Sequence, residues 1–333
     1  MSWQVESQRN GLRLPQIDWW LDAHRPVARS FVSHAHADHV ARHREILCSP
    51  PTARLVRARL PGRREEHILP FGQTERLAPD CTVTLHPAGH ILGSAQILLE
   101  HTAHGRLLYT GDFKLRPGLA AEPCAIPPAD TLIMETTFGR PRYTLPPSAE
   151  VFAAIVAFCR DALADGATPV LFAYSLGKSQ ELLAGLADAR LPVTLHPKAL
   201  EITRIYEELG FAFAPGAIFD DTVTEDRVVV CPSQTADSAW FKNIPRPRTA
   251  VVSGWALDDG ARYRYRCDAV FPLSDHADYP DLLRFVEAVN PRRVFTVHGF
   301  AQDFARDLRR LGREAWALGR DNQLELLLPG DAE

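Results

Sequence analysis

The segment His34-Ala-His36-Ala-Asp38-His39 constrains this chain more than any other stretch of its sequence. It places four side chains that can bind metal within six residues, directly after a predicted strand at Phe31–Ser33. A loop that leaves a strand end can turn alternate side chains inward, so His34 and His36 can share one metal ion. Asp38 and His39 then point toward a second ion. With so few histidines in the chain, a chance match is about a one-in-a-thousand event. The segment therefore predicts a metal centre.

One loop cannot complete two coordination spheres, because a catalytic metal ion takes three or four protein ligands and keeps one position open. Three further candidates each follow a predicted strand. Any one of them alone would more often cap a turn or make a buried polar contact. Their shared place at strand ends predicts that they join the loop ligands. They are His90 in HPAGHILG, Asp112 in LLYTGDFK and His298 in FTVHGF.

Size and composition set the broad class. At 333 residues the chain is long for one compact core and suits two intimate domains. A hydrophobic content of 46% with 23% charged residues is ordinary for a soluble globular enzyme. No apolar run reaches the roughly 18 residues of a membrane span, and residues 1–10 lack an apolar signal core, so we expect a cytoplasmic protein without a membrane partner. The six cysteines, without C-x-x-C spacing, predict reduced core residues.

Secondary-structure patterns divide the chain. The first 135 residues alternate short β-rich runs with turns, which is typical of antiparallel hairpins. From Ala149 a helical apolar spacing begins, and strand–helix–strand alternation favours a small parallel α/β domain. The main elements expected after residue 149 are strands at 169–173, 228–230, 250–253, 269–272 and 293–297 and helices at 178–186, 199–209 and 279–289.

Longer stretches resemble a known family. The H-x-H-x-D-H loop, the later histidine, the aspartate of TGD and the C-terminal histidine resemble the metallo-β-lactamase superfamily. LIMETTFG, LFAYSLGKSQELL, VVSGW, PLSDHADY and TVHGF are similar to segments of its β-CASP nucleases, most of all the bacterial DNA ligase-associated exonucleases. The resemblance implies an α/β fold, a metallo-β-lactamase αββα sandwich with an inserted β-CASP-like α/β lid domain. The insert would span 147–267, and 1–146 with 268–333 would form the sandwich.

The same resemblance implies the ligand sets of two divalent metal ions per chain, zinc or manganese. Histidine and carboxylate ligands accept either metal. One ion would be held by His34, His36 and His90, the other by Asp38, His39 and His298, with Asp112 bridging.

Three other residues would assist these ligands. Asp22, in WWLDA, would support the metal loop from outside the coordination sphere, although a solvent-facing turn residue would look the same. His276, in PLSDHADY, would protonate the leaving oxygen, and Glu135, in LIMETTFG, would favour its charged form by pairing. Together with Asp38 these two form the expected catalytic set. Without the family match, His276 would be interpreted as a helix-start residue.

Nucleic-acid binding is expected from local charge, because the net charge of −4 says little about one surface. Residues 54–64 and 240–266 are rich in arginine, although either could be a solvated face. AYSLGKSQ predicts a phosphate seat where a strand opens into a helix. A tryptophan after VVSG would stack on a base, unless it packs in the core, and the arginines of ARYRYR would share one strand face. The substrate-binding candidates are Ser175, Lys178, Trp255 and Arg264.

These features favour a metal-dependent exodeoxyribonuclease in DNA repair. Its substrate would be single-stranded DNA or a DNA end, and its functional associates an ATP-dependent DNA ligase and a helicase. The alternative is an RNA endonuclease or exonuclease of the same family. A small-ester hydrolase is disfavoured by the long insert and the Glu135–His276 pair. An inactive scaffold is disfavoured because every ligand is present.

The first prediction is a stoichiometry of two metal ions per chain. Elemental analysis of protein purified without a chelator should approach two equivalents, because seven ligands suffice for two open coordination spheres. His36→Ala should lose metal and activity. A His36→Ala protein with the full metal content and full activity would contradict the ligand assignment.

Overall fold

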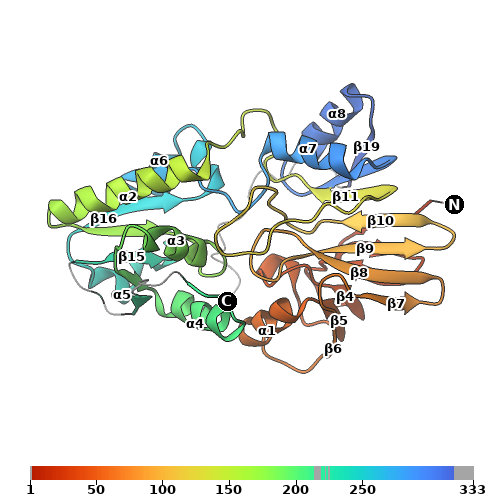
Figure 1. Ribbon diagram of the computed structural model, residues 1–333, viewed down its shortest axis with the longest axis horizontal. Coiled ribbons are helices and arrows are strands. Elements are labelled where there is room, and N and C mark those ends of the chain that lie inside the picture. The colour runs from red at the N-terminus through yellow and green to blue at the C-terminus, as the bar shows by residue number, and fades with distance from the viewer. Residues whose placement is uncertain (1, 214–218, 222, 224–225, 319–333) are drawn as a thin grey trace. The chain divides into compact units, whose positions relative to one another are not determined.

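A computed structural model of the chain describes residues 2–213, 219–221, 223 and 226–318 (Figure 1). The chain divides into two compact units, one formed by Met1–Tyr143 with His276–Glu333 and the other by Thr144–Asp275. The inserted domain was expected at 147–267, so the second unit begins three residues earlier and ends eight residues later than expected. Within the described ranges the strands form three sheets, of six, seven and six strands.

The first unit contains two of these sheets. Its six-stranded sheet has the order β1-β2-β3-β4-β5-β6, and its seven-stranded sheet has the order β19-β18-β11-β10-β9-β8-β7. The strands of the first sheet are β1 (Glu6–Gln8), β2 (Gly11–Leu14), β3 (Trp19–Leu21), β4 (Arg29–Phe31), β5 (Glu45–Cys48) and β6 (Glu65–Ile68). Those of the second are β7 (Thr74–Ala78), β8 (Cys81–Pro87), β9 (Ala95–His101), β10 (Gly105–Tyr109), β11 (Thr131–Glu135), β18 (Arg293–Val297) and β19 (Glu314–Ala317).

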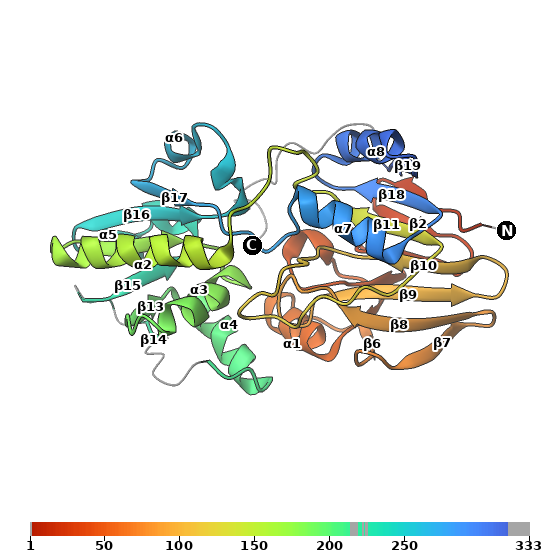
Figure 2. The same ribbon diagram turned by 45° about the horizontal axis from the view of Figure 1, so that its top comes forward.

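Alternation of side chains along the strands builds two apolar layers. In β10, Leu107 and Tyr109 join the core that the two sheets share, whereas Leu108 joins the core on the opposite face. Helices α7 (Tyr279–Val289) and α8 (Ala301–Arg310) cover that opposite face through buried side chains such as Phe285 and Phe304 (Figure 2). Helix α1 (Pro50–Arg59) packs beside β6 of the first sheet. The unit is the expected αββα sandwich.

Strand direction gathers the ends of these strands at one edge. β3 and β4 are parallel, as are β10, β11 and β18. β8 runs in the direction of β10, because both are antiparallel to β9 between them. The segments that leave the carboxyl ends of these strands therefore meet. All the predicted metal ligands lie on such segments.

The second unit is built around a six-stranded parallel sheet of order β14-β13-β15-β12-β16-β17. Its two faces carry separate apolar clusters, and one of them receives side chains of α2 and α3. The strands are β12 (Thr168–Phe172), β13 (Val193–Leu195), β14 (Phe219–Asp220), β15 (Val228–Cys231), β16 (Pro247–Val252) and β17 (Ala269–Phe271). The helices are α2 (Ser148–Ala164), α3 (Lys178–Ala187), α4 (Pro197–Glu208), α5 (Ala239–Lys242) and α6 (Ala261–Tyr265).

One expectation about this unit is wrong. Residues 262–266, interpreted from the sequence as a strand with arginines on one face, form helix α6 and its left-handed C-cap at Arg266. Alternating Arg and Tyr residues fit a strand. Gly260, however, has a left-handed backbone with φ 75° and directs the chain into a short helix.

Two smaller findings concern composition. All six cysteines are free, and five of them are buried, as expected. None of the helices in the described ranges has the length and apolar character to cross a membrane.

Candidate metal centre

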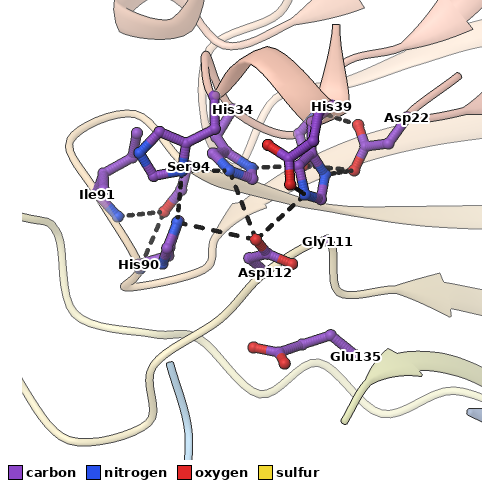
Figure 3. A network of polar contacts seen from close by, with 12 residues as sticks. Asp22, His34, His39, His90, Ile91, Ser94, Gly111, Asp112 and Glu135 are labelled. Atoms are coloured by element: carbon purple, nitrogen blue, oxygen red, sulfur yellow. Dashed lines mark hydrogen bonds and ion pairs between the residues drawn. The ribbon is translucent and has the colours of Figure 1, made fainter. Parts of the chain in front are cut away.

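Three imidazoles meet where the loop after β4 faces the segment after β8. Figure 3 shows two of them, His34 and His90. His34 Nε2 lies 2.9 Å from His36 Nδ1, which lies 3.1 Å from His90 Nε2. The backbone of the β8 segment is fixed by Ser94, whose Oγ accepts from His90 N at 3.1 Å. The structure thus brings together the three residues expected to hold one ion.

The spacing of these nitrogens suits a metal ion. Ligand nitrogens about 2.0–2.1 Å from a tetrahedral ion lie roughly 3.3 Å apart, close to the separations seen here. His34 Nδ1 contacts Ser33 Oγ at 2.9 Å, so its Nε2 is the atom that faces the other two rings. His34 and His90 are almost completely buried. A single proton can bridge only one facing pair of these nitrogens, whereas a metal ion between them can accept the lone pairs of all three at once.

Asp112, on the segment after β10, faces both groups of ligands. One oxygen of its carboxylate, Oδ2, lies 3.6 Å from His34 Nε2, 3.9 Å from His90 Nε2 and 3.2 Å from His39 Nε2. A single oxygen within reach of both sets has the position that a bridging ligand needs. Figure 3 shows it between His34, His90 and His39.

The second group of ligands is more open. His39 Nε2 lies 3.6 Å from Asp38 Oδ2, and the Asp38 side chain is 60% exposed. The His298 ring centroid lies 5.6 Å from that of His39, and His298 is exposed on a left-handed turn with φ 57°. The turn is tight because a Cβ on Gly299 would meet Thr137 Cα at 2.3 Å. Asp38 and His298 thus lie near His39, as expected, and both are exposed.

Burial and charge set the protonation of these groups. Burial, together with the neighbouring His39 and His90, holds the pKa of His34 well below its ordinary value. Burial would also lower the pKa of His39, but Asp112, Asp38 and Asp22 raise it well above the usual range. Burial disfavours the Asp112 anion, yet His39 and His276 keep the pKa of this carboxyl well below its ordinary value. At neutral pH the centre therefore offers an uncharged His34 and an ionised Asp112, which are the forms that bind metal.

Asp22 lies behind the ligands. Its Oδ2 accepts from His39 Nδ1 at 2.9 Å, which leaves His39 Nε2 to face the metal side. Sequence reasoning missed two partners of this carboxylate, Ser33 and Tyr109, whose hydroxyls donate to the same oxygen at 2.6 and 2.9 Å. Ser33 directly precedes the ligand loop, but Tyr109 carries no sequence signal, because it reaches Asp22 only through the packing of the two sheets.

His276 and Glu135 form a pair beside the ligands. His276 Nδ1 lies 2.9 Å from Glu135 Oε1, and the His276 ring centroid lies 4.6 Å from that of His90. Glu135 is fully buried at the end of β11, where its carboxylate also accepts from Phe113 N at 3.2 Å and Thr137 N at 2.9 Å. This fixed carboxylate orients the imidazole through its Nδ1 atom.

The expected phosphate seat differs from its prediction. Lys178 at the start of α3 is 1% exposed, and its ammonium lies 3.0 Å from Glu181 Oε2 and 3.7 Å from Asp275 Oδ1. Burial lowers the pKa of this ammonium, but Asp275 and Glu181 outweigh that effect and raise it. The Gly177 N–H donates to Gln180 Oε1 at 2.7 Å. Lys178 is therefore paired with two carboxylates inside the fold, which disfavours a contact with substrate phosphate.

The other substrate-binding candidates are more accessible. Ser175 and Trp255 are partly buried. Arg264 is half-exposed and pairs with Asp258 at 3.1 Å. Nothing in these contacts assigns Ser175 or Trp255 a ligand.

Comparison with known proteins identifies similar sequences. A family model described as "Zn-dependent metallo-hydrolase RNA specificity domain" matches residues 263–318. A probable DNA ligase of Opitutus terrae is 63% identical over 326 residues, which cover 98% of this chain and 32% of that protein. The 5′ exonuclease Apollo of Mus musculus is 31% identical over 312 residues, covering 86% of this chain and 55% of that protein.

A third kind of relative is archaeal. The transcription termination factor FttA of Pyrococcus abyssi is 27% identical over 314 residues, covering 73% of this chain and 48% of that protein. The chain thus spans only 32% to 55% of the length of these three relatives.

Proposed function

We propose that this chain is a metal-dependent nuclease that hydrolyses DNA from an end. The proposal starts from its family, because the chain belongs to the β-CASP family of the metallo-β-lactamase fold. The observation that carries the proposal is the His276–Glu135 pair beside the cluster of predicted metal ligands. A nucleoside alkoxide is a strongly basic leaving group, so its departure is assisted by a positioned acid.

The residues divide the chemistry between them. Two divalent metal ions held by the seven ligands would activate water and neutralise charge on the phosphate. Glu135 accepts the Nδ1 proton of His276 and favours the imidazolium, so Nε2 can pass a proton to the leaving oxygen. Phe113 N and Thr137 N hold Glu135 in place, which keeps the donor positioned.

DNA is the proposed substrate because two relatives carry names that refer to DNA ligation or exonuclease activity. The proposal includes a functional association with an ATP-dependent DNA ligase. It rests on the probable DNA ligase, to which 98% of this chain is similar. The second candidate is an RNA nuclease, which the description of the matching model and the similarity to FttA favour.

A substrate panel tests this function. End-labelled single- and double-stranded DNA and RNA of one sequence, incubated with manganese- or zinc-supplemented protein, should give mononucleotides from DNA only. A circular single-stranded DNA serves as the control, because it has no end for an exonuclease. Degradation of RNA alone would support the second candidate, and cutting of the circle would show an endonuclease.

His276 gives a sharper prediction. His276→Ala should keep both metal ions and lower turnover on DNA by about 10²–10⁴, the usual contribution of a positioned proton donor. The loss should shrink on a nitrophenyl phosphodiester, whose leaving group needs no proton, and Glu135→Gln should show a weaker form of the same selectivity. The matched control is His67→Ala, because His67 also pairs with a carboxylate, Glu75, at 2.7 Å but on the surface. Equal losses on both substrates would make His276 a structural residue.

Helix α6 offers a surface for the nucleic-acid strand. Tyr263 is 86% exposed, the largest exposure among the large hydrophobic side chains in the described ranges. Arg262, Arg264 and Arg266 around it are exposed. In the part of the chain that the structure describes, Arg266 has no ion-pair partner. An aromatic ring among guanidinium groups suits stacking on a base with contacts to the neighbouring phosphates.

Replacing Tyr263 tests this surface. Tyr263→Ala should weaken binding of a single-stranded oligonucleotide about 5- to 150-fold, the equivalent of about 1–3 kcal/mol for one stacked base. Fluorescence anisotropy in chelator would measure binding without cleavage, and Tyr263→Phe should retain affinity. Trp316→Ala, at an exposed aromatic residue on β19, is the control. Unchanged affinity in Tyr263→Ala would rule α6 out as a stacking surface.

A further inference from the structure

Asp22 and Ser33 form one hydrogen-bonded unit beneath the metal ligands. Ser33 N donates to Asp22 Oδ1 at 2.7 Å, and Ser33 Oγ donates to Asp22 Oδ2 at 2.6 Å. The same Oγ atom lies 2.9 Å from His34 Nδ1. Ser33 is completely buried and Asp22 nearly so, so each side chain depends on partners inside the protein for its hydrogen bonds.

The positions of the protons follow from these contacts. A serine hydroxyl has one proton, and here it points to the carboxylate, which can only accept. If His34 Nδ1 carried no proton, two lone pairs would face each other across 2.9 Å in a buried site. His34 Nδ1 must therefore donate to Ser33 Oγ. Its Nε2 is then left with a lone pair toward His36, His90 and Asp112.

The His39 ring is fixed in the same way but without an intermediary. Its Nδ1 donates directly to Asp22 Oδ2 at 2.9 Å, and its Nε2 faces Asp112. The two histidines belong to different proposed metal sites. The carboxylate of Asp22 is thus connected to a ligand of each.

We propose that Ser33 is a positioning residue that links Asp22 to His34, so that one carboxylate sets the ring orientation and tautomer of a histidine in each metal site. The local structure is built around this serine. Gly111, with φ 55°, has no space for a side chain, since a Cβ there would meet Ser33 Cβ at 2.5 Å and Oγ at 2.6 Å. Tyr109 donates a third hydrogen bond to Asp22 Oδ2 and reaches neither histidine among its described contacts.

The link predicts how metal affinity responds to substitution. Ser33→Ala should weaken the three-histidine site by about 10- to 100-fold, the usual effect of losing a partner of a metal-bound histidine. Asp22→Asn should weaken both sites. The double variant should be no weaker at the three-histidine site than the weaker single variant, because the two changes break the same link. Tyr109→Phe should disturb that site less than Ser33→Ala does.

Chelator competition with zinc, followed on the wild type and each variant, measures these affinities. A His298→Ala background removes a proposed ligand of the second site, so the remaining ion reports on the three-histidine site. Nitrogen NMR of the metal-free protein adds a direct readout, because the Nδ1–H form of His34 should dominate in the wild type and not in Ser33→Ala. Ser179→Ala, which removes a buried serine hydroxyl that bonds Tyr174 O in the other unit, is the matched control.

The inference rests on the proposed metal site and not on the choice of substrate, so the two can fail separately. A wild-type protein that binds no zinc would overturn the proposed function and the link together. Normal zinc affinity and an unchanged His34 tautomer in a folded Ser33→Ala protein would overturn the link alone. A protein that binds zinc as predicted, and whose affinity falls in Ser33→Ala, but that does not cleave DNA would overturn the proposed substrate and support the link.

Discussion

The candidate metal centre is built around the hydrogen bonds that the buried carboxylate of Asp22 accepts. It follows β3 of one sheet and accepts a hydrogen bond from Tyr109 at the end of β10 in the other. The two sheets are therefore joined by a hydrogen bond at the edge where their ligands meet. An Asp at φ 44° can adopt this left-handed turn, because its short polar side chain tolerates that region better than most residues do.

Around this carboxylate the site separates two kinds of polar group. His34, His36 and His90 are close together and directed at one another, an arrangement in which one metal ion can accept the lone pairs of all three. The His276–Glu135 pair, by contrast, is satisfied within the protein by complementary charge and by backbone N–H groups. One set is thus suited to hold metal and the other to move a proton. The predicted ligands and Glu135 lie at the same strand ends because parallel strands bring their carboxyl ends to one edge, and His276 reaches Glu135 from the segment before α7.

Several sequence expectations match the described fold. Helix Tyr279–Val289 and strand Arg293–Val297 have the predicted bounds, because apolar spacing and capping residues mark them clearly. Strand β2 and helix α8 were not predicted. Their buried side chains pack in the apolar cores of the sandwich, and tertiary packing stabilises such elements more than local propensity does. The strand predicted at residues 262–266 was wrong for a related reason. Alternation with a period of two residues does not indicate whether a neighbouring strand is present to pair with.

The sequence by itself determined which chemical groups this chain offers as candidates. Histidine, aspartate and glutamate at strand exits indicated metal ligation and proton transfer, because few other side chains bind a metal ion or donate a proton near neutral pH. Only the tertiary structure decided which nitrogen of each histidine faces the ligands and that Lys178 is neutralised inside the fold. It also placed Ser33 and Tyr109 on Asp22. Such contacts join residues as much as 87 positions apart, and their geometry follows from how two sheets pack, which no local pattern encodes.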